Sequence, residues 1–400
     1  MKIDEQADAI LRVEPSRRVS ADGFAARIFL AFLATAGLFY VNIMPAIVDG
    51  LVEGLGFTAR QAGFVGSANI YGAAAGALLI VFLIRRVVWR PTACVLLGVL
   101  ILMDLLSMWI TLPGAMTAFR LVHGIVGGAL VGVGFSVIAR TSNPDRTFGV
   151  LLVVQFGLGG LGNLFLPRLV PFFGTDVLFL SLIAFSVITA IMLPFLPGYA
   201  VKTETGPVTA REPIAIFPLA LVLLSIFLFQ AANMGLFAFI IGLGRTSGLE
   251  LSYITTTLAA SGWIGIIGPI IVIGIYTKFG RMRPLVMAMI VTAIANWALH
   301  FSDNAMIFLV ANCAVGITWA FTMPYLLGLT AEFDKAGQMA ALGGFASKMG
   351  LATGPFVAGL LLGDDNYARL INIAVFALIV ALIASVIPAI KHDRLAAGRA

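Results

Sequence analysis

Residues 370–390 read LINIAVFALIVALIASVIPAI, a run of 21 residues without a charged side chain. A helix rises 1.5 Å per residue, so about 20 apolar residues cross the hydrocarbon core of a bilayer. Eleven earlier stretches have the same character and predict a polytopic membrane protein. The twelve predicted spans are 28–48, 61–84, 91–112, 116–139, 147–167, 176–197, 217–241, 253–276, 284–301, 305–329, 338–362 and 370–390.

The composition supports this interpretation. The 400 residues are 60% hydrophobic and 11% charged, whereas soluble domains are about 45–50% apolar and about 25% charged. A soluble globular protein and a disordered chain are both excluded. The alternation of a transmembrane β-strand is absent, which leaves an all-α membrane protein. Both cysteines lie inside spans and the three histidines are scattered, so we predict no disulfide framework, metal site or cofactor.

The distribution of basic residues predicts the orientation in the membrane. Of the 25 Lys and Arg residues, 19 lie on the side of the two termini, four lie on the opposite side and two lie within spans. Basic loops stay in the cytoplasm, so both termini are predicted to be cytoplasmic in an inner membrane. The formal charge of +6 follows from this topology and predicts no nucleic-acid partner. Residues 1–27 and 391–400 are predicted as cytoplasmic tails.

The chain divides into two similar halves. The least apolar stretch in mid-chain is GYAVKTETGPVTAREP at 198–213, which predicts a cytoplasmic linker between bundles 28–197 and 214–390. The halves repeat at an offset near 192 residues, as in the pairs Gly56/Gly248, Ala68/Ala260 and Gly76/Gly268, and loop 84–91 matches loop 277–284. Duplicated helical halves are typical of secondary transporters.

Local motifs resemble the major facilitator superfamily. The fourth span reads Phe-Arg120-Leu-Val-His123-Gly124 and is similar to the family pattern Arg-x-x-Gln-Gly, with His in place of Gln. The basic loop after span 8 is similar to the family's loop, but Thr277 stands where the family has Asp. The resemblance implies two pseudo-symmetric six-helix bundles, transport by alternating access, and gating loops. The gating residues are Arg85, Arg86, Arg90, Lys278, Gly280, Arg281 and Arg283.

Three charges, Asp104, Arg120 and Lys348, lie well inside spans, where each costs about 2.5–3.5 kcal/mol on insertion scales. Asp104 and Arg120 are at similar depths on consecutive helices, so we predict a buried ion pair. The functional alternative is that Asp104 releases a coupling proton. Lys348 either snorkels toward Glu332 or Asp334 near the cytoplasm or binds an anionic substrate.

Neutral polar and aromatic side chains complete the predicted substrate or coupling site. These are His123, Asn42, Asn69, Tyr71, Asn163, Gln230, Asn233, Trp263, Asn312, Trp319 and Tyr325. For any one amide, bonding to a neighbouring helix is the plainer interpretation. Prolines 45, 269, 324 and 355 are predicted to interrupt spans 1, 8, 10 and 11.

The leading prediction is a monomeric secondary transporter of a small organic anion, in contact with lipid and not an enzyme. No Walker sequence and no nucleophile elbow is found. Two alternatives stay open. One is a proton-coupled multidrug antiporter for neutral or cationic compounds, and the other is a membrane protein of the same frame that senses a ligand or lipid.

Overall fold

The computed structural model describes residues 18–83, 87–199, 215–275, 280–331, 333, 338–363 and 366–397. Most of the predicted linker and residues 1–17 of the predicted tail 1–27 lie outside these residues. So do three gating residues and the two acids proposed as partners of Lys348, namely Arg85, Arg86, Lys278, Glu332 and Asp334.

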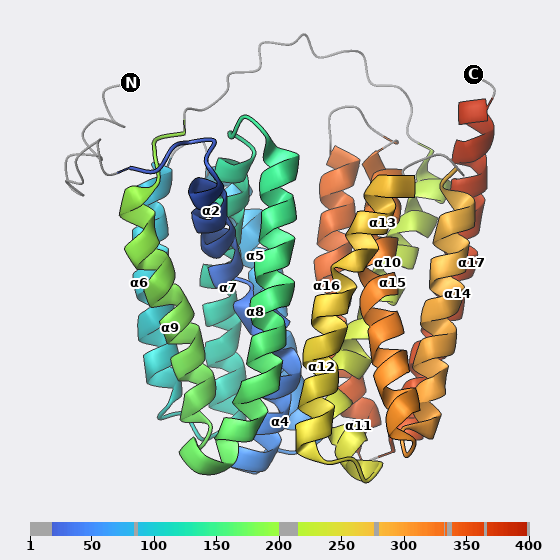
Figure 1. Cartoon of the computed structure of the whole chain (residues 1–400), viewed down its shortest axis with the longest axis horizontal. Helices are drawn as coiled ribbons and strands as arrows, with labels where there is room; N and C mark the ends of the chain where they lie inside the picture. Colours follow the sequence, from blue (N-terminus) through green and yellow to red (C-terminus); the bar gives the residue numbers. More distant parts are fainter. Residues whose placement is uncertain are drawn as a thin grey trace. The chain divides into compact units, whose positions relative to one another are not determined.

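The described residues form an all-helical protein (Figure 1). Ten helices within them are long and apolar enough to cross a membrane. The first predicted span is divided among three short helices, and the eleventh corresponds to α16 (Gln338–Leu361). With these two, the helices agree with the twelve predicted spans.

The packing divides the chain into two compact units. Unit 1 contains residues 1–43, 68–162 and 169–208, and unit 2 contains 44–67, 163–168 and 209–400. The separation into bundles 28–197 and 214–390 stays a prediction. Unit 1 holds α2 (Phe24–Ala36), α3 (Phe39–Asn42), most of α5 (Ala59–Leu83), α6 (Trp89–Ser107), α7 (Pro113–Ile138), most of α8 (Pro144–Phe173), α9 (Asp176–Met192) and η2 (Leu193–Phe195).

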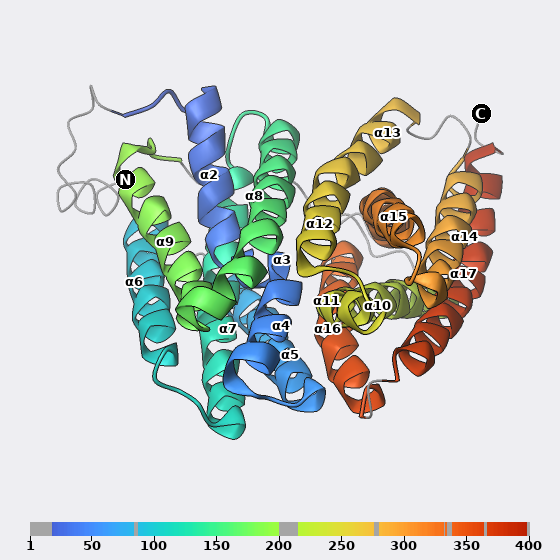
Figure 2. The ribbon, with the colours of Figure 1, turned by 60° about the horizontal axis from the view of Figure 1, so that its bottom comes forward.

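Unit 2 holds the remaining helices and the first residues of α5. Its elements are α4 (Met44–Leu55), α10 (Ile216–Ala238), α11 (Ile240–Thr246), α12 (Leu251–Gly265), α13 (Ile267–Ile275), α14 (Met282–Ala298), η3 (Leu299–Phe301), α15 (Ala305–Ala331), α16 and α17 (Tyr367–Ala397). Within it, α14 and α17 run side by side (Figures 1 and 2). The helix α17 continues through Ala397 into the predicted tail 391–400, which stays a prediction.

Prolines break two of the four helices in which they were predicted to do so. Pro45 lies in the first turn of α4, and Pro269 lies in the first turn of α13, so spans 1 and 8 are each interrupted just before a proline. The prediction is wrong for Pro324 and Pro355, which lie inside continuous helices. Membrane helices tolerate such prolines because neighbouring groups satisfy the freed carbonyls.

The predicted internal repeat is visible as equivalent helix contacts. A Cβ on Gly76 would lie 1.9 Å from the Ile125 carbonyl oxygen, and a Cβ on Gly268 would lie 2.4 Å from that of Ile317. Both members of the second pair lie 192 residues after those of the first. Gly56 and Gly248 show the same relation, since both have a positive φ, of 67° and 81°. The two halves thus repeat in structure as well as in sequence.

Apolar side chains cover the outside of the long helices as well as their packed faces. In unit 1 the α2, α6 and α7 faces meet in a core that includes Leu30, Leu97 and Leu130. On other faces Val95 is 64% exposed and Phe376 is 68% exposed. Such a surface is costly in water and suits lipid.

Candidate functional site

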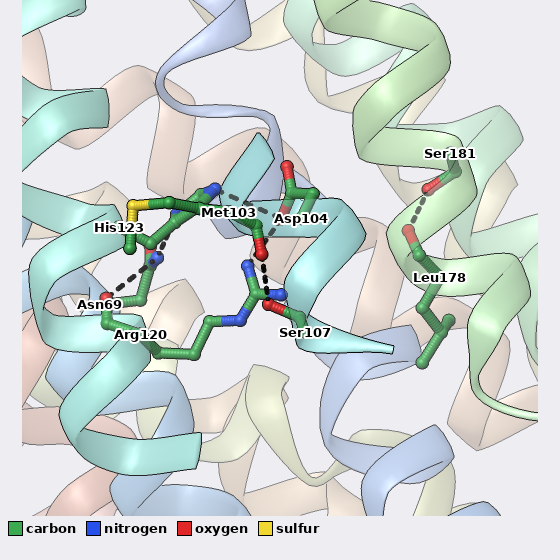
Figure 3. Close-up of polar contacts among 8 residues, drawn as sticks. All are labelled: Asn69, Met103, Asp104, Ser107, Arg120, His123, Leu178 and Ser181. Carbon is green, nitrogen blue, oxygen red and sulfur yellow. Dashed lines mark hydrogen bonds and ion pairs between the residues drawn. The ribbon is translucent and has the colours of Figure 1, made fainter. Parts of the chain in front are cut away.

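Two buried charges of unit 1 lie at the centre of one polar cluster, which we call the Asp104 cluster: Asp104, Arg120, His123 and Asn69 (Figure 3). The Arg120 Nη1 atom donates a hydrogen bond of 2.7 Å to the Asp104 Oδ1 atom. The predicted ion pair is confirmed. It joins α6 to α7, because the hairpin between them brings equal depths together.

His123 extends the pair to a third helix. Its Nε2 atom lies 3.2 Å from the same Asp104 oxygen, but off the direction of a good hydrogen bond. Its Nδ1 atom lies 2.9 Å from the Asn69 Nδ2 atom on α5. The Asn69 amide nitrogen also donates to the Arg120 backbone carbonyl, at 3.4 Å. Three predicted site residues therefore meet around Asp104.

Two aromatic rings that the sequence did not single out enclose the guanidinium. The Arg120 Cζ atom lies 4.7 Å from the ring centre of Phe179 and 5.5 Å from that of Tyr40. Arg120 is 0% exposed, and its Nε and Nη2 atoms have no hydrogen-bond partner among the described residues. Cation–π contacts with these two rings therefore add to the stabilisation of the guanidinium by the carboxylate.

The repeat shows that this charge pair is not a requirement of the helix packing. Counting 192 residues forward, Asp104 corresponds to Asn296 and Arg120 to Asn312. Asn296 donates to the Asn233 side chain at 3.1 Å, and Asn312 donates to the Phe308 carbonyl at 2.8 Å. The second half therefore has amide side chains at the positions where the first half has the ion pair. This difference indicates that the charges of the first half have a role beyond helix packing.

Unit 2 contains a second polar group, the Gln230 network of Gln230, Trp319 and Ser347. The Trp319 indole donates to the Gln230 Oε1 atom at 2.5 Å, and the Gln230 Nε2 atom donates to the Ser347 hydroxyl at 2.7 Å. These contacts join α10, α15 and α16. Gln230 and Trp319 were predicted site residues, whereas Ser347 enters through its contact with Gln230.

Lys348 follows Ser347 on α16 and is half-buried. It forms no ion pair or hydrogen bond with any residue that the structure describes. Residues 7 and 11 positions further lie on the same helical face, and at the far end of that face Pro355 and Gly359 contact the start of α5. Lys348 therefore lies on the same face of α16 as Pro355 and Gly359.

A further set of ion pairs lies near the ends of α4 and α11 within unit 2. The Arg245 guanidinium contacts the Asp49 carboxylate at 3.1 Å and that of Glu53 at 3.3 Å. Arg168 donates to the Thr255 hydroxyl at 2.7 Å and to the Ser252 carbonyl at 2.6 Å. The fifth span was predicted to end at residue 167, but α8 continues through Arg168 to Phe173.

The described residues of the predicted gating loops are held by hydrogen bonds to distant parts of the chain. Arg90 is buried and donates to the Leu196 carbonyl at 2.6 Å. At the start of α14, the backbone N–H groups of Arg281 and Met282 donate to the Asp393 carboxylate, at 2.9 and 3.0 Å. A carboxylate at a helix N-terminus is favourable. Asp393 was not predicted as part of this loop, because it is far from Arg281 in the sequence.

Gly280 and Arg283 complete that loop. Gly280 has a φ of 72°, and a Cβ on it would lie 2.5 Å from the Asp393 carboxylate. The position therefore requires glycine for its conformation and for the approach of α17. Arg283 is exposed.

The remaining predicted site residues are Asn42, Asn163, Tyr71, Tyr325 and Trp263. Asn42 donates to the Gln155 carbonyl at 3.5 Å in unit 1, which is the plainer interpretation of an amide in a helix. Asn163 is buried on α8, and Tyr71 is half-buried on α5. The ring centres of Tyr325 and Phe321 are 5.2 Å apart. Trp263 is 42% exposed on α12.

Comparison with known proteins identifies the family. Two solved structures share the fold: a mutant of the nucleoside transporter NupG (14% identity, TM-score 0.68, covering 92% of this chain and 98% of that one) and NupG itself (12%, 0.71, 90% and 97%). No curated protein matches the chain. The family model of the Major Facilitator Superfamily matches residues 28–355. The chain therefore belongs to the major facilitator superfamily of secondary transporters.

Proposed function

We propose that this transporter moves a small organic anion by alternating access, and that Lys348 binds the anionic group. The observation that carries the proposal is the difference among the three embedded charges. Asp104 and Arg120 neutralise each other at 2.7 Å, whereas Lys348 has no partner among the described residues. A cation inside a span is costly unless a counter-charge is supplied, and an anionic substrate supplies one.

The surroundings of Lys348 support the same proposal. The Gln230 network fixes Ser347 next to it through a 2.7 Å hydrogen bond, so this part of α16 is held by α10. Trp319 adds an aromatic surface, 6.0 Å from the Phe237 ring. Lys348 thus follows directly on a residue of a network that contains both hydrogen-bonding and aromatic groups, and a site of that composition suits a partly apolar anion.

The antiporter alternative needs a carboxylate inside a span that is not already paired with a basic side chain, so that it can bind a proton or a cationic substrate. Asp104 is 1% exposed and holds Arg120 and His123. Asp49 is 7% exposed and bonded to Arg245. Both acids are thus already neutralised by a cation of the chain, which favours the organic anion.

Lys348→Gln is expected to abolish transport of the anion while leaving the purified protein monodisperse. It is also expected to remove thermal stabilisation by that anion, which at 100 times Kd is about 2.7 kcal/mol. Lys348→Arg keeps the charge and is expected to retain part of both effects. The measurement is a thermal-shift screen with anionic, neutral and cationic compounds, including nucleosides, followed by uptake into proteoliposomes.

Arg369→Gln is the matched control, because Arg369 is an exposed cation beyond the spans and its loss should change neither result. Normal anion transport by Lys348→Gln contradicts the proposal. Stabilisation of the wild type by cations alone would favour the multidrug alternative.

We also propose that the termini and the 198–213 linker face the cytoplasm of the inner membrane, on the basis of the basic residues. In a background of Cys94→Ser and Cys313→Ser, a cysteine placed at Thr205 should react with an impermeant maleimide only after the cells are opened. A cysteine at the exposed Glu250, directly before α12, should react in intact cells. The reverse pattern contradicts the orientation.

A further inference from the structure

The hydrogen bonds of the Asp104 cluster determine where His123 carries its proton. An amide nitrogen only donates, and the Asn69 Nδ2 atom lies 2.9 Å from the His123 Nδ1 atom. The same nitrogen faces the Arg120 carbonyl oxygen at 3.4 Å, which fixes the orientation of the amide. Nδ1 is therefore an acceptor, and the proton of the neutral ring is on Nε2, on the side of the Asp104 carboxylate.

In this form the cluster is electrically neutral. Asp104 from α6 and Arg120 from α7 cancel, and the imidazole adds no charge. The other titratable group of the described residues facing the ring is Tyr40, whose ring centre lies 6.4 Å away. Its hydroxyl is buried without a hydrogen-bond partner among the described residues. Phe179 contributes only its ring.

A second proton on the His123 ring gives the cluster a net positive charge. It adds to the Nδ1 lone pair, so a ring N–H then faces the N–H of Asn69, and two cations share one carboxylate. The bond from Asn69 must break, and the amide must rotate or withdraw. The Tyr40 oxygen is an unpartnered acceptor in the same buried region.

The protonation is coupled to helix packing because Asn69 lies at the crossing of α5 and α7. A Cβ on Gly124 would lie 2.0 Å from the Asn69 carbonyl oxygen, so the two backbones are in direct contact. An amide that leaves His123 at this point changes the contact between the helices. The equivalent crossing of the second half has Ser261 and Gly316, and Val315 corresponds to His123.

We propose that His123 is the binding site of a coupling proton, accepted at Nδ1, and that Asn69 is the positioning residue that keeps the ring in its Nε2–H form until the proton arrives. The proton comes from water, and nothing is oxidised or reduced. This inference depends on the transport activity but not on the charge of the substrate.

The first test is a spectroscopic one that needs no substrate. His300→Gln and His392→Gln leave His123 as the single histidine, and ¹⁵N NMR of labelled imidazole distinguishes Nε2–H, Nδ1–H and doubly protonated rings. We expect the wild-type ring in the Nε2–H form, with Nδ1 accepting from Asn69. Asn69→Asp replaces that donor with a carboxylate acceptor and is expected to place a proton on Nδ1.

Asn296→Asp is the matched control, since it alters a buried amide in unit 2 and should leave the spectrum unchanged. An Nδ1–H ring in the wild type, or an unchanged ring in a monodisperse Asn69→Asp protein, overturns the assignment. Asn69→Leu removes the donor without adding charge, and it should yield mixed tautomers if Asn69 sets the form.

The second test measures coupling in proteoliposomes that contain a pH-sensitive dye. His123→Gln keeps a donor and an acceptor at the position, and it is expected to exchange substrate while substrate-driven proton movement falls to background. His300→Gln, which removes a ring bonded to Asn372, should move protons as the wild type does. Proton movement that survives His123→Gln overturns the proposal. If the transported compound is not an anion, the Lys348 proposal fails and this measurement is made with that compound.

Discussion

Asp104→Asn is expected to lower the free energy of unfolding by about 3–5 kcal/mol, because it leaves a buried guanidinium without its counter-charge. Arg120 is fully buried, and two of its nitrogens already lack hydrogen bonds within the described residues. Arg120→Gln should cost less, since His123 can take up a proton and supply the missing charge to Asp104.

The double substitution tests whether the two charges act together. Since Asn296 and Asn312 occupy the equivalent positions of the second half, a neutral pair is compatible with this frame. Asp104→Asn with Arg120→Gln should cost clearly less than the sum of the single losses, as measured by SDS titration of the purified protein. Additive losses would exclude direct coupling.

The sequence predicted the membrane fold well because its signal is composition and length. Uncharged runs such as 370–390 specify a spanning helix directly, and the 192-residue repeat located equivalent helices before any contact was known. The Asp104–Arg120 pair was predictable for the same reason, since two costly charges at equal depth on adjacent helices must meet.

The contacts that the sequence did not reveal depend on distant partners. Tyr40 and Phe179 are ordinary aromatic residues of their spans, and only the packing places them on Arg120. Asp393 lies more than 100 residues from the helix end that it caps. Pro324 and Pro355 have the same local signature as Pro45, but neighbouring helices keep their backbone helical. Periodicity cannot supply such information.

Gly76→Ala is expected to destabilise the protein by at least the 1–3 kcal/mol that is typical of overpacking. The added Cβ would lie 1.9 Å from the Ile125 carbonyl oxygen, which is backbone and cannot rotate away. The helices α5 and α7 must therefore separate, and the neighbouring contact between Asn69 and His123 is strained with them. Gly268→Ala, at the equivalent crossing, should be milder, since its nearest oxygen lies at 2.4 Å.

Gly98→Ala provides the matched control, because no atom lies within 4 Å of the position where its Cβ would be built. That substitution should leave stability unchanged or raise it by up to about 1 kcal/mol, as alanine favours a helix more than glycine does. Both variants are compared by thermal unfolding in the same detergent. Equal stability of Gly76→Ala and Gly98→Ala would show that the α5–α7 crossing is loose, and proton binding at His123 would then have no tight contact through which to move these helices.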